Sequence, residues 1–401
     1  MGKVKSFFVL QWQPMLTVVL GIALLVALLW YNLGTNTPGL SAIELQTVQD
    51  SSTFSNLIAN PLFLPFKLPL FVLQQLGYTS IFALRSVGAV YGLIAAVLFY
   101  IVLRQWHTKR IATIGAALFV TSSWFLQTSR LAAPYILYPL GIISLFVIFY
   151  WLYKSRHRKL VFLISSVVAV GSLYIPGMIW FVGTCFIWQL PQIKAFVKKL
   201  PIWVLFVVVP ILLVLFAPLV YASIQNYHIA LGFLGAPEAF MPQEWIKRLL
   251  VLPVFVLARG PLEPVLNLGR LPLLDIFSAA MAVLGVYWYS FKIKLLRTRL
   301  LSVFTFIAAI LIMLNGVTML PLLLPLSYIV ITAGIMLLLQ QWFTVFPRNP
   351  IARSLGIGIV CIAIGVTGAY HMRRYFVAWS GDPITKATFS YQLPANTTDA
   401  Q

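Results

Sequence analysis

Residues 201–222 read PIWVLFVVVPILLVLFAPLVYA, an apolar stretch without a single charged residue. An α-helix needs about 20 predominantly apolar residues to cross the hydrocarbon core of a bilayer. This stretch is long enough, and its composition is typical of a transmembrane helix. Similar stretches recur along the 401-residue chain, which indicates a protein that crosses the membrane several times.

The composition excludes the other broad classes. Hydrophobic residues make up 61% of the chain and charged residues 9%, whereas soluble domains carry about 25% charged residues. A water-soluble protein of this length could not cover its surface with so few charges. A disordered chain is excluded for the same reason, because disorder requires low hydrophobicity.

The apolar stretches predict an all-α polytopic membrane protein with about eleven transmembrane helices. We expect the first to be an anchor rather than a signal peptide, because its apolar run is too long for a signal sequence and no cleavage site follows. Residues 160–190 are read as two short helices, because Pro176 and Gly177 interrupt the run. The expected spans lie near 15–34, 82–103, 111–128, 133–153, 160–175, 177–190, 201–222, 273–291, 300–317, 320–341 and 355–370.

The charge distribution predicts the orientation. The chain has 28 Lys and Arg against 8 Asp and Glu, a net charge of +20. A nucleic-acid-binding protein would gather such charge on one polar face, but here it falls in short clusters between apolar runs, so we expect no nucleic-acid partner. Basic loops stay in the cytoplasm, which predicts a multi-pass plasma-membrane protein with a cytoplasmic N-terminus. The clusters lie at 3–5, 104–110, 154–159, 194–199, 292–299 and 348–353.

The acidic residues all fall on the opposite, extracytoplasmic side or at its rim. Two explanations are open: cytoplasmic loops beside anionic lipid avoid acids, or carboxylate chemistry takes place outside the cytoplasm. The eight residues are Glu44, Asp50, Glu238, Glu244, Glu263, Asp275, Asp382 and Asp399.

Two long outer loops organise the chain. Each contains an apolar segment, at 61–76 and 245–257, that we expect to form a short helix in the membrane interface. The chain therefore divides into an N-terminal transmembrane module at 1–222 with a first loop at 35–81, a second loop at 223–272, C-terminal helices at 273–370, and an outer tail at 371–401.

Signatures of soluble enzymes are missing, including the nucleophile elbow, the P-loop and the zinc-protease motif. Of the four histidines, His107 and His157 are expected to be solvated in basic inner loops. His228 and His371 lie outside without an obvious partner. The charged side chains on the outer side are therefore the candidates for a functional site.

Five outer charges are candidates. Glu44 and Asp50 are six residues apart, so they would not share one face of a helix. Lys67 is the only charge in an apolar stretch, and either reaches the lipid headgroups or binds a lipid phosphate. Arg85 and Arg130, at the outer ends of spans, are headgroup anchors if taken singly. Together with Lys67 they would form a better phosphate site than any one of them.

The N-terminal half resembles the GT-C superfamily of membrane glycosyltransferases, in particular the family 39-like branch of protein O-mannosyltransferases and aminoarabinose transferases. The likeness covers about residues 15–180 and departs from the family pattern at Ile43, which replaces an Asp, and at Ala133, which replaces an Arg. The motifs are Pro38-Gly39-Leu40 with Glu44, Lys67-Leu68-Pro69-Leu70, Phe82-Ala83-Leu84-Arg85, and Thr121-Ser122-Ser123 through Ser129-Arg130 to Pro134-Tyr135.

This resemblance implies a GT-C fold and an enzyme that moves a hexose or pentose from a polyprenyl phosphate to an acceptor at the outer face. The acceptor, whether protein, lipid or envelope glycan, is left open. No nucleotide site is required, and a divalent metal is left open because no convincing ligand set is visible. The residues implied are Glu44 as catalytic base with Asp50 second, Lys67, Arg85 and Arg130 at the donor phosphate, and Tyr135 in the substrate pocket.

The sequence leaves two other functions open. One is a transporter or flippase of a lipid-linked or small substrate, which eleven helices would suit. Against it, the spans carry almost no charge, whereas ion-coupled transporters place charged groups within the membrane. The other is a non-catalytic relative, which the apolar residue at Ile43 would suggest.

Overall fold

The computed structural model describes residues 16, 18–154, 158–199, 201–237, 239 and 241–392. Within these ranges the backbone is helical with short connections, and the β pairing is one isolated antiparallel bridge between Leu40 and Tyr391. The prediction of an all-α chain is confirmed.

Every predicted span overlaps a helix. The first coincides with the apolar helix Val18–Trp30. The others coincide with α5 (Ile81–Trp106), α6 (Lys109–Thr121) with α7 (Ser123–Ser129), α8 (Leu137–Lys154), α9 (Arg158–Leu173), α10 (Met178–Val197), α11 (Ile202–Gln225), α14 (Ile276–Ser290), α15 (Leu296–Asn315), α16 (Leu323–Val345) and α17 (Pro350–Arg373).

Several helices have the length and apolarity of membrane spans. In the described part of the chain five helical segments qualify, or six if α6 and α7, bent by 62° at their junction, count as one span. These apolar helices indicate a membrane protein. The number of eleven crossings, the plasma-membrane location and the orientation stay predictions.

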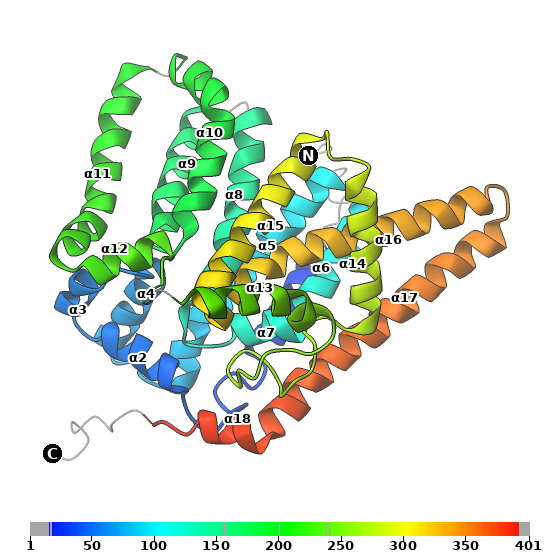
Figure 1. Ribbon diagram of the computed structural model, residues 1–401, viewed down its shortest axis with the longest axis horizontal. Coiled ribbons are helices and arrows are strands. Elements are labelled where there is room, and N and C mark those ends of the chain that lie inside the picture. Colours follow the sequence, from blue (N-terminus) through cyan, green and yellow to red (C-terminus); the bar gives the residue numbers. More distant parts are fainter. Residues whose placement is uncertain are drawn as a thin grey trace, which may run out of the picture.

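Helix α11 illustrates why a bilayer is needed. It stands at the edge of the molecule in Figure 1, and Phe206, Val214 and Ile224 are largely exposed on it. A contiguous apolar surface of this kind is rare on soluble monomers. Hydrocarbon is the environment that such a helix fits.

Shorter helices gather in the lower half of Figure 1. They come from both long loops, from the turns between spans and from the end of the described chain. They are α2 (Ala42–Asp50), α3 (Phe54–Ala59), α4 (Leu64–Gln75), α12 (Tyr227–Leu234), α13 (Pro242–Leu257), α18 (Pro383–Thr388), the 3₁₀ segments η1 (Pro134–Ile136) and η2 (Gly316–Leu322), and the π-helical η3 (Arg374–Trp379).

The two apolar segments of the long loops are helical, as predicted. Residues 61–76 contain α4, and residues 245–257 lie within α13. Helix α4 leaves Leu68, Val72 and Leu76 exposed while it buries Phe66 and Lys67. An exposed apolar face of this kind is what an interfacial helix presents to lipid, although its position in a membrane stays a prediction.

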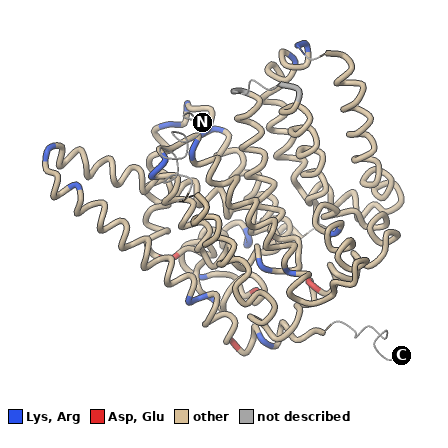
Figure 2. Tube along the Cα trace, turned by 180° about the vertical axis from the view of Figure 1, so that it is seen from behind, with Lys and Arg blue, Asp and Glu red and all other residues tan. Residues whose placement is uncertain are grey.

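Charge is distributed as expected between the two ends of the molecule. In Figure 2 the acidic residues lie in the lower half, and the upper half carries only Lys and Arg. Glu238 and Asp399 lie outside the described residues. The short helices and the acids therefore share one end of the fold.

The break within 160–190 is confirmed as a boundary between two helices. Helix α9 ends at Leu173 and α10 begins after Gly177, whose φ of +75° is left-handed. Glycine adopts this conformation without the steric cost that other residues meet. The Gly177 N–H donates to the carbonyl of Phe233 at 3.1 Å, which ties this turn to α12.

Helices α14 and α16 pack backbone against backbone through two glycines. A Cβ at Gly334 would lie 1.9 Å from the carbonyl oxygen of Met281, and one at Gly285 would meet Val330 equally closely. We therefore expect Gly334→Ala to lower the free energy of unfolding by about 1–3 kcal/mol, as overpacking does. Thermal unfolding of the purified protein in detergent measures this.

The matched control is Gly365→Ala on α17, where an added Cβ has no neighbour within 4 Å. Alanine is the better helix former, so this variant should be as stable as the wild type or slightly more stable. Equal loss of stability in both variants would contradict the close packing of α14 on α16.

Candidate functional site

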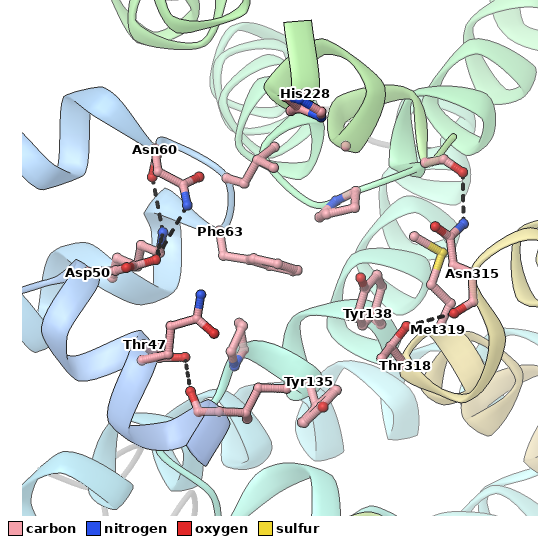
Figure 3. Close-up of a pocket in the computed structure, with 18 of the residues that line it drawn as sticks. Thr47, Asp50, Asn60, Phe63, Tyr135, Tyr138, His228, Asn315, Thr318 and Met319 are labelled. Atoms are coloured by element: carbon pink, nitrogen blue, oxygen red, sulfur yellow. Dashed lines mark hydrogen bonds and ion pairs between the residues drawn. The ribbon is translucent and has the colours of Figure 1, made fainter. Parts of the chain in front are cut away.

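A cavity of about 460 Å³ lies between the first loop, α12 and η2, as Figure 3 shows. This volume is within the range of small-molecule sites. Of the residues predicted for the site, Asp50, Lys67 and Tyr135 line it, whereas Glu44, Arg85 and Arg130 do not.

An ion pair forms one wall of the cavity. Lys67 Nζ donates to Asp50 Oδ2 at 2.9 Å and to the carbonyl oxygen of Asn60 at 3.1 Å. The side chain of Lys67 is 4% exposed and that of Asp50 is 29% exposed. Burial lowers the pKa of Lys67 from its usual 10.5, and the neighbouring Asp50 opposes this only in part. Lys67 therefore turns inward toward Asp50 and does not reach out to solvent.

The local backbone explains how this pair is assembled. Helix α2 ends at Asp50, and the chain returns through α3 to α4. Phe63 precedes α4 with a left-handed φ of +61°, and its N–H donates to the carbonyl of Tyr174 at 2.8 Å. This turn aims the first turn of α4, with Lys67, back at the end of α2.

The opposite wall carries neutral polar and aromatic groups. In Figure 3 Asp50 lies on one side of the cavity, Asn315 and Thr318 on the other, and His228 above. Asn315 Nδ2 donates to the carbonyl of Gly235 at 2.8 Å. Asn315 and Thr318 could not be predicted from the sequence, because neutral polar residues at the end of a span resemble ordinary helix caps. The sequence alone gives His228 no role.

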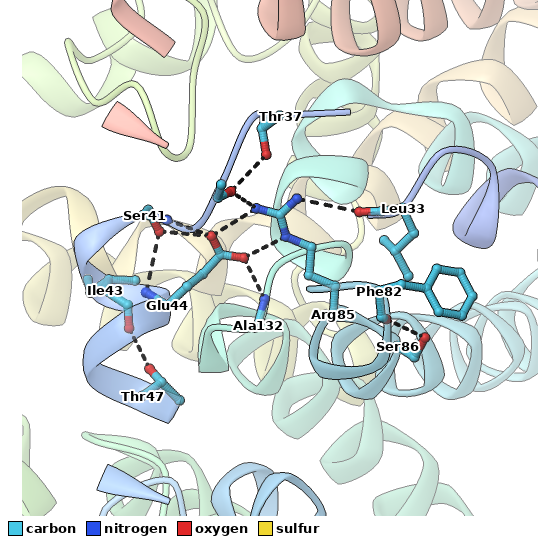
Figure 4. A network of polar contacts seen from close by, with 11 residues as sticks. Leu33, Thr37, Ser41, Ile43, Glu44, Thr47, Phe82, Arg85, Ser86 and Ala132 are labelled. Atoms are coloured by element: carbon cyan, nitrogen blue, oxygen red, sulfur yellow. Dashed lines mark hydrogen bonds and ion pairs between the residues drawn. The ribbon is translucent and has the colours of Figure 1, made fainter. Parts of the chain in front are cut away.

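Glu44 is buried away from the cavity. Its exposure is 0%, and its carboxylate accepts hydrogen bonds from Arg85 Nε at 2.9 Å, the Ala132 N–H at 2.9 Å and the Ser41 N–H at 2.9 Å. Figure 4 shows the carboxylate enclosed by these donors. The Ser41 hydroxyl also accepts from the Glu44 N–H, which completes a capping box at the start of α2. Glu44 thus joins α2 to α5 and to the turn before η1.

Arg85 is fully engaged in the same network. It pairs with Glu44, and its remaining N–H groups donate to the carbonyls of Gly39 at 2.8 Å and Leu33 at 3.4 Å. It is as buried as its partner and does not line the cavity, so it does not reach a phosphate bound there. Arg85 therefore holds the start of the first loop against α5.

Arg130 has a corresponding role beside the first apolar helix. It donates to the carbonyl oxygens of Leu28, at 3.1 Å, and Tyr31. Its guanidinium lies over the rings of Phe376 and Tyr375, at 4.6 and 5.1 Å from their centroids. Of the three predicted cations only Lys67 lines the cavity, whereas Arg85 and Arg130 lie near one another and donate to backbone carbonyls.

His371 corrects one expectation from the sequence. It does have partners: His371 Nε2 lies 3.1 Å from Asp275 Oδ1, and Nδ1 lies 3.1 Å from the Ser123 hydroxyl. The order Ser–His–Asp matches that of a catalytic triad, but Ser123 is only 2% exposed. The contacts fasten α17 to α7 and to the start of α14.

The inner-loop histidines need a second correction. His107 is buried rather than solvated, and its Nδ1 lies 3.4 Å from the sulfur of Met336. The cause is that the chain turns inward after α5 instead of into solvent. His157 lies outside the described residues.

The described residues contain no cluster of candidate metal ligands. No group of three or more His, Cys, Asp or Glu side chains within them is arranged to hold a metal ion. A comparison of the chain with models of known protein families finds no match, and a comparison with curated proteins finds none that is significant. The resemblance to GT-C glycosyltransferases rests on the quoted motifs alone.

Proposed function

We propose that the chain is a membrane glycosyltransferase that moves a hexose or pentose from a polyprenyl phosphate to an acceptor at the outer face of the plasma membrane. The observation that carries the proposal is the Asp50–Lys67 pair, 2.9 Å apart on the wall of the cavity. Sugar transfer from a phosphate uses a base for the acceptor hydroxyl and a cation for the leaving phosphate, and this pair supplies both.

The transfer breaks the bond between the sugar's anomeric carbon and the phosphate oxygen, and forms a bond from that carbon to the acceptor oxygen. The acceptor hydroxyl loses its proton to Asp50, which acts as general base. Negative charge develops on the departing polyprenyl phosphate, and Lys67 stabilises it. Cleavage of the sugar–phosphate bond is favourable enough to drive the transfer, so no nucleotide enters the step.

Asp50 and Lys67 each have one polar group that can contact the substrate. Both hydrogen bonds to Asp50, from Lys67 and from Asn60 Nδ2, reach Oδ2. In the described part of the chain no donor engages Oδ1, which is left to receive a proton. Lys67 has three N–H groups, of which two are engaged, so one can bind a phosphate oxygen.

Asp50 suits the role of base better than Glu44. Glu44 is enclosed by donors and lies off the cavity, and taking up a proton there would break its pairing with Arg85. Ile43, where the resembling family has Asp, lines the cavity with an apolar side chain. Among the described residues Asp50 is then the one carboxylate on the cavity wall.

The surroundings suit a lipid-linked donor. The exposed apolar face of α4, with Leu68 and Val72, lies on the same helix as Lys67. A polyprenyl tail in the bilayer would run along this face while its phosphate reaches Lys67. The rings of Phe63, Tyr135 and Tyr138 line the cavity beyond and offer flat apolar surfaces to a sugar.

Lys67→Ala is expected to weaken binding of polyprenyl phosphate by about 10- to 100-fold, the value of a charge-assisted hydrogen bond of about 1.5–3 kcal/mol. Binding of radiolabelled polyprenyl phosphate to the purified protein in detergent measures this. Lys247→Ala is the control, because Lys247 is an exposed lysine of the second loop. Equal affinity of the Lys67 variant and the control would remove Lys67 from the donor site.

The same assay has a pH readout. Because the pKa of Lys67 is lowered, its charge is lost at a lower pH than that of a free lysine, and binding should weaken as the pH rises toward 10.5. Lys67→Arg keeps its charge throughout this range. An alkaline loss of binding that is identical in wild type and Lys67→Arg would place the titrating group elsewhere.

A further inference from the structure

A second cavity, of about 470 Å³, lies at the opposite end of the fold from the Asp50–Lys67 pair. It is enclosed by the end of α5, by α8 and by the start of α15. Its walls are mostly aromatic and aliphatic, and they include Trp106, Phe146, Phe149, Leu300 and Arg297. The rings of Trp106 and Phe146 meet edge to face with centroids 5.5 Å apart.

Arg297 is the cation of this cavity. Its Nη1 donates to the carbonyl of Trp106 at 3.2 Å, and its guanidinium lies over the ring of Trp288 at 5.4 Å from the centroid. Its Nε is buried without a hydrogen-bond partner. In the described part of the chain no carboxylate pairs with it, so its charge is not neutralised by the protein.

The surrounding connections add positive charge. The segments 104–110 and 292–299 contain Arg and Lys and no acidic residue, and Figure 2 shows only basic residues in this half of the molecule. The positive charge also acts on a neighbouring side chain. The pKa of His107 is lowered to about 4, mainly by burial and secondly by the charge of Arg297. An anion is the ligand that would complete this site.

The apolar walls restrict further which class of anion fits the cavity. A free inorganic anion would leave the apolar surface that these walls turn to the cavity, including that of Phe149, uncovered, whereas an anion attached to a hydrocarbon chain would cover it. Basic pockets between transmembrane helices on the cytoplasmic side recognise anionic lipid headgroups. The positive-inside rule predicts that this end faces the cytoplasm.

We infer that the cavity between α5, α8 and α15 binds an anionic phospholipid of the cytoplasmic leaflet, with a phosphate oxygen on Arg297 and an acyl chain against Phe146 and Phe149. This site is independent of the proposed sugar transfer, because it shares no residue with the Asp50–Lys67 cavity. A lipid held there would brace α5 against α15 at the end of the fold away from the chemistry.

Native mass spectrometry of the purified, delipidated full chain tests this with an equimolar mixture of phosphatidylglycerol and phosphatidylcholine of matched acyl chains. The wild type should retain phosphatidylglycerol with a preference of about tenfold or more, because the cationic choline of phosphatidylcholine is repelled by Arg297 and the basic segments around it, at about the value of one charge-assisted contact. Arg297→Gln should lose this preference. Arg348→Gln should keep it, because Arg348 is an exposed arginine of the same basic end, at the connection between α16 and α17.

Two further arms make the outcome decisive. Circular dichroism verifies that Arg297→Gln is folded, and Arg297→Lys should keep part of the preference. Glycerol phosphate and inorganic phosphate, added to the wild type, should not displace the lipid at millimolar concentration. Equal retention of the two lipids by wild type, an unchanged preference in Arg297→Gln, or displacement by inorganic phosphate would overturn the inference.

Discussion

Asp50→Asn is expected to reduce sugar transfer by about 10²- to 10⁴-fold, the usual contribution of a general base. Asparagine keeps the shape of the side chain but cannot take up the acceptor's proton at Oδ1. The ion pair becomes a hydrogen bond from the Lys67 ammonium to a neutral amide oxygen, and Lys67 keeps its contact with the carbonyl of Asn60. The assay is release of polyprenyl phosphate from labelled donor, in the presence of a solubilised envelope extract that supplies the acceptor.

Glu244→Gln is the control for this prediction. Glu244 is an exposed carboxylate of the second loop, paired with Arg248 at 2.8 Å across one helical turn. Such surface pairs contribute little to stability, so this variant should transfer sugar like the wild type. Full activity of Asp50→Asn, with unaltered unfolding, would exclude Asp50 as the base.

Glu44→Gln is expected to lower the stability of the fold by about 3–5 kcal/mol, because it leaves Arg85 buried without its counter-charge. Neither side chain has contact with solvent, and they meet at 2.9 Å. Arg85→Met should be destabilising to a similar degree. The readout is the thermal unfolding of each purified variant in detergent.

A double variant separates structure from catalysis. Glu44→Gln combined with Arg85→Met removes both charges, and should lose less stability than the two single variants added together. A Glu44→Gln protein that unfolds like the wild type and yet transfers no sugar would contradict this account. It would restore Glu44 to the catalytic role that the sequence resemblance implies.

Much of the fold could be predicted because a bilayer imposes a local rule. A run such as 201–222 must be helical, since its backbone groups find no other partners in hydrocarbon. The same rule located α5, and Pro176 with Gly177 marked the break between α9 and α10. It could not give the 62° bend between α6 and α7, where Ser122 adopts an extended conformation and caps α7.

The candidate site was predictable only in part. Lys67 stands out as the only charge in an apolar stretch and Asp50 as the second carboxylate of the same loop, and the structure brings them together. The burial of Glu44 could not be predicted from the sequence, because its partner Arg85 lies on the next span. The contact of His371 with Asp275 was hidden for the same reason, since the residues are far apart in the chain. The hydrophobic pattern of a segment predicts the helix that it forms, but not the side chain on another helix that will contact it.

Turnover of a panel of polyprenyl-phosphate sugars by the purified wild-type protein tests the central claim most directly. We predict that one donor is consumed, that polyprenyl phosphate is released, and that the sugar becomes covalently attached to the acceptor. If no donor binds, or if a substrate crosses the membrane of proteoliposomes without covalent change, the chain is not a glycosyltransferase.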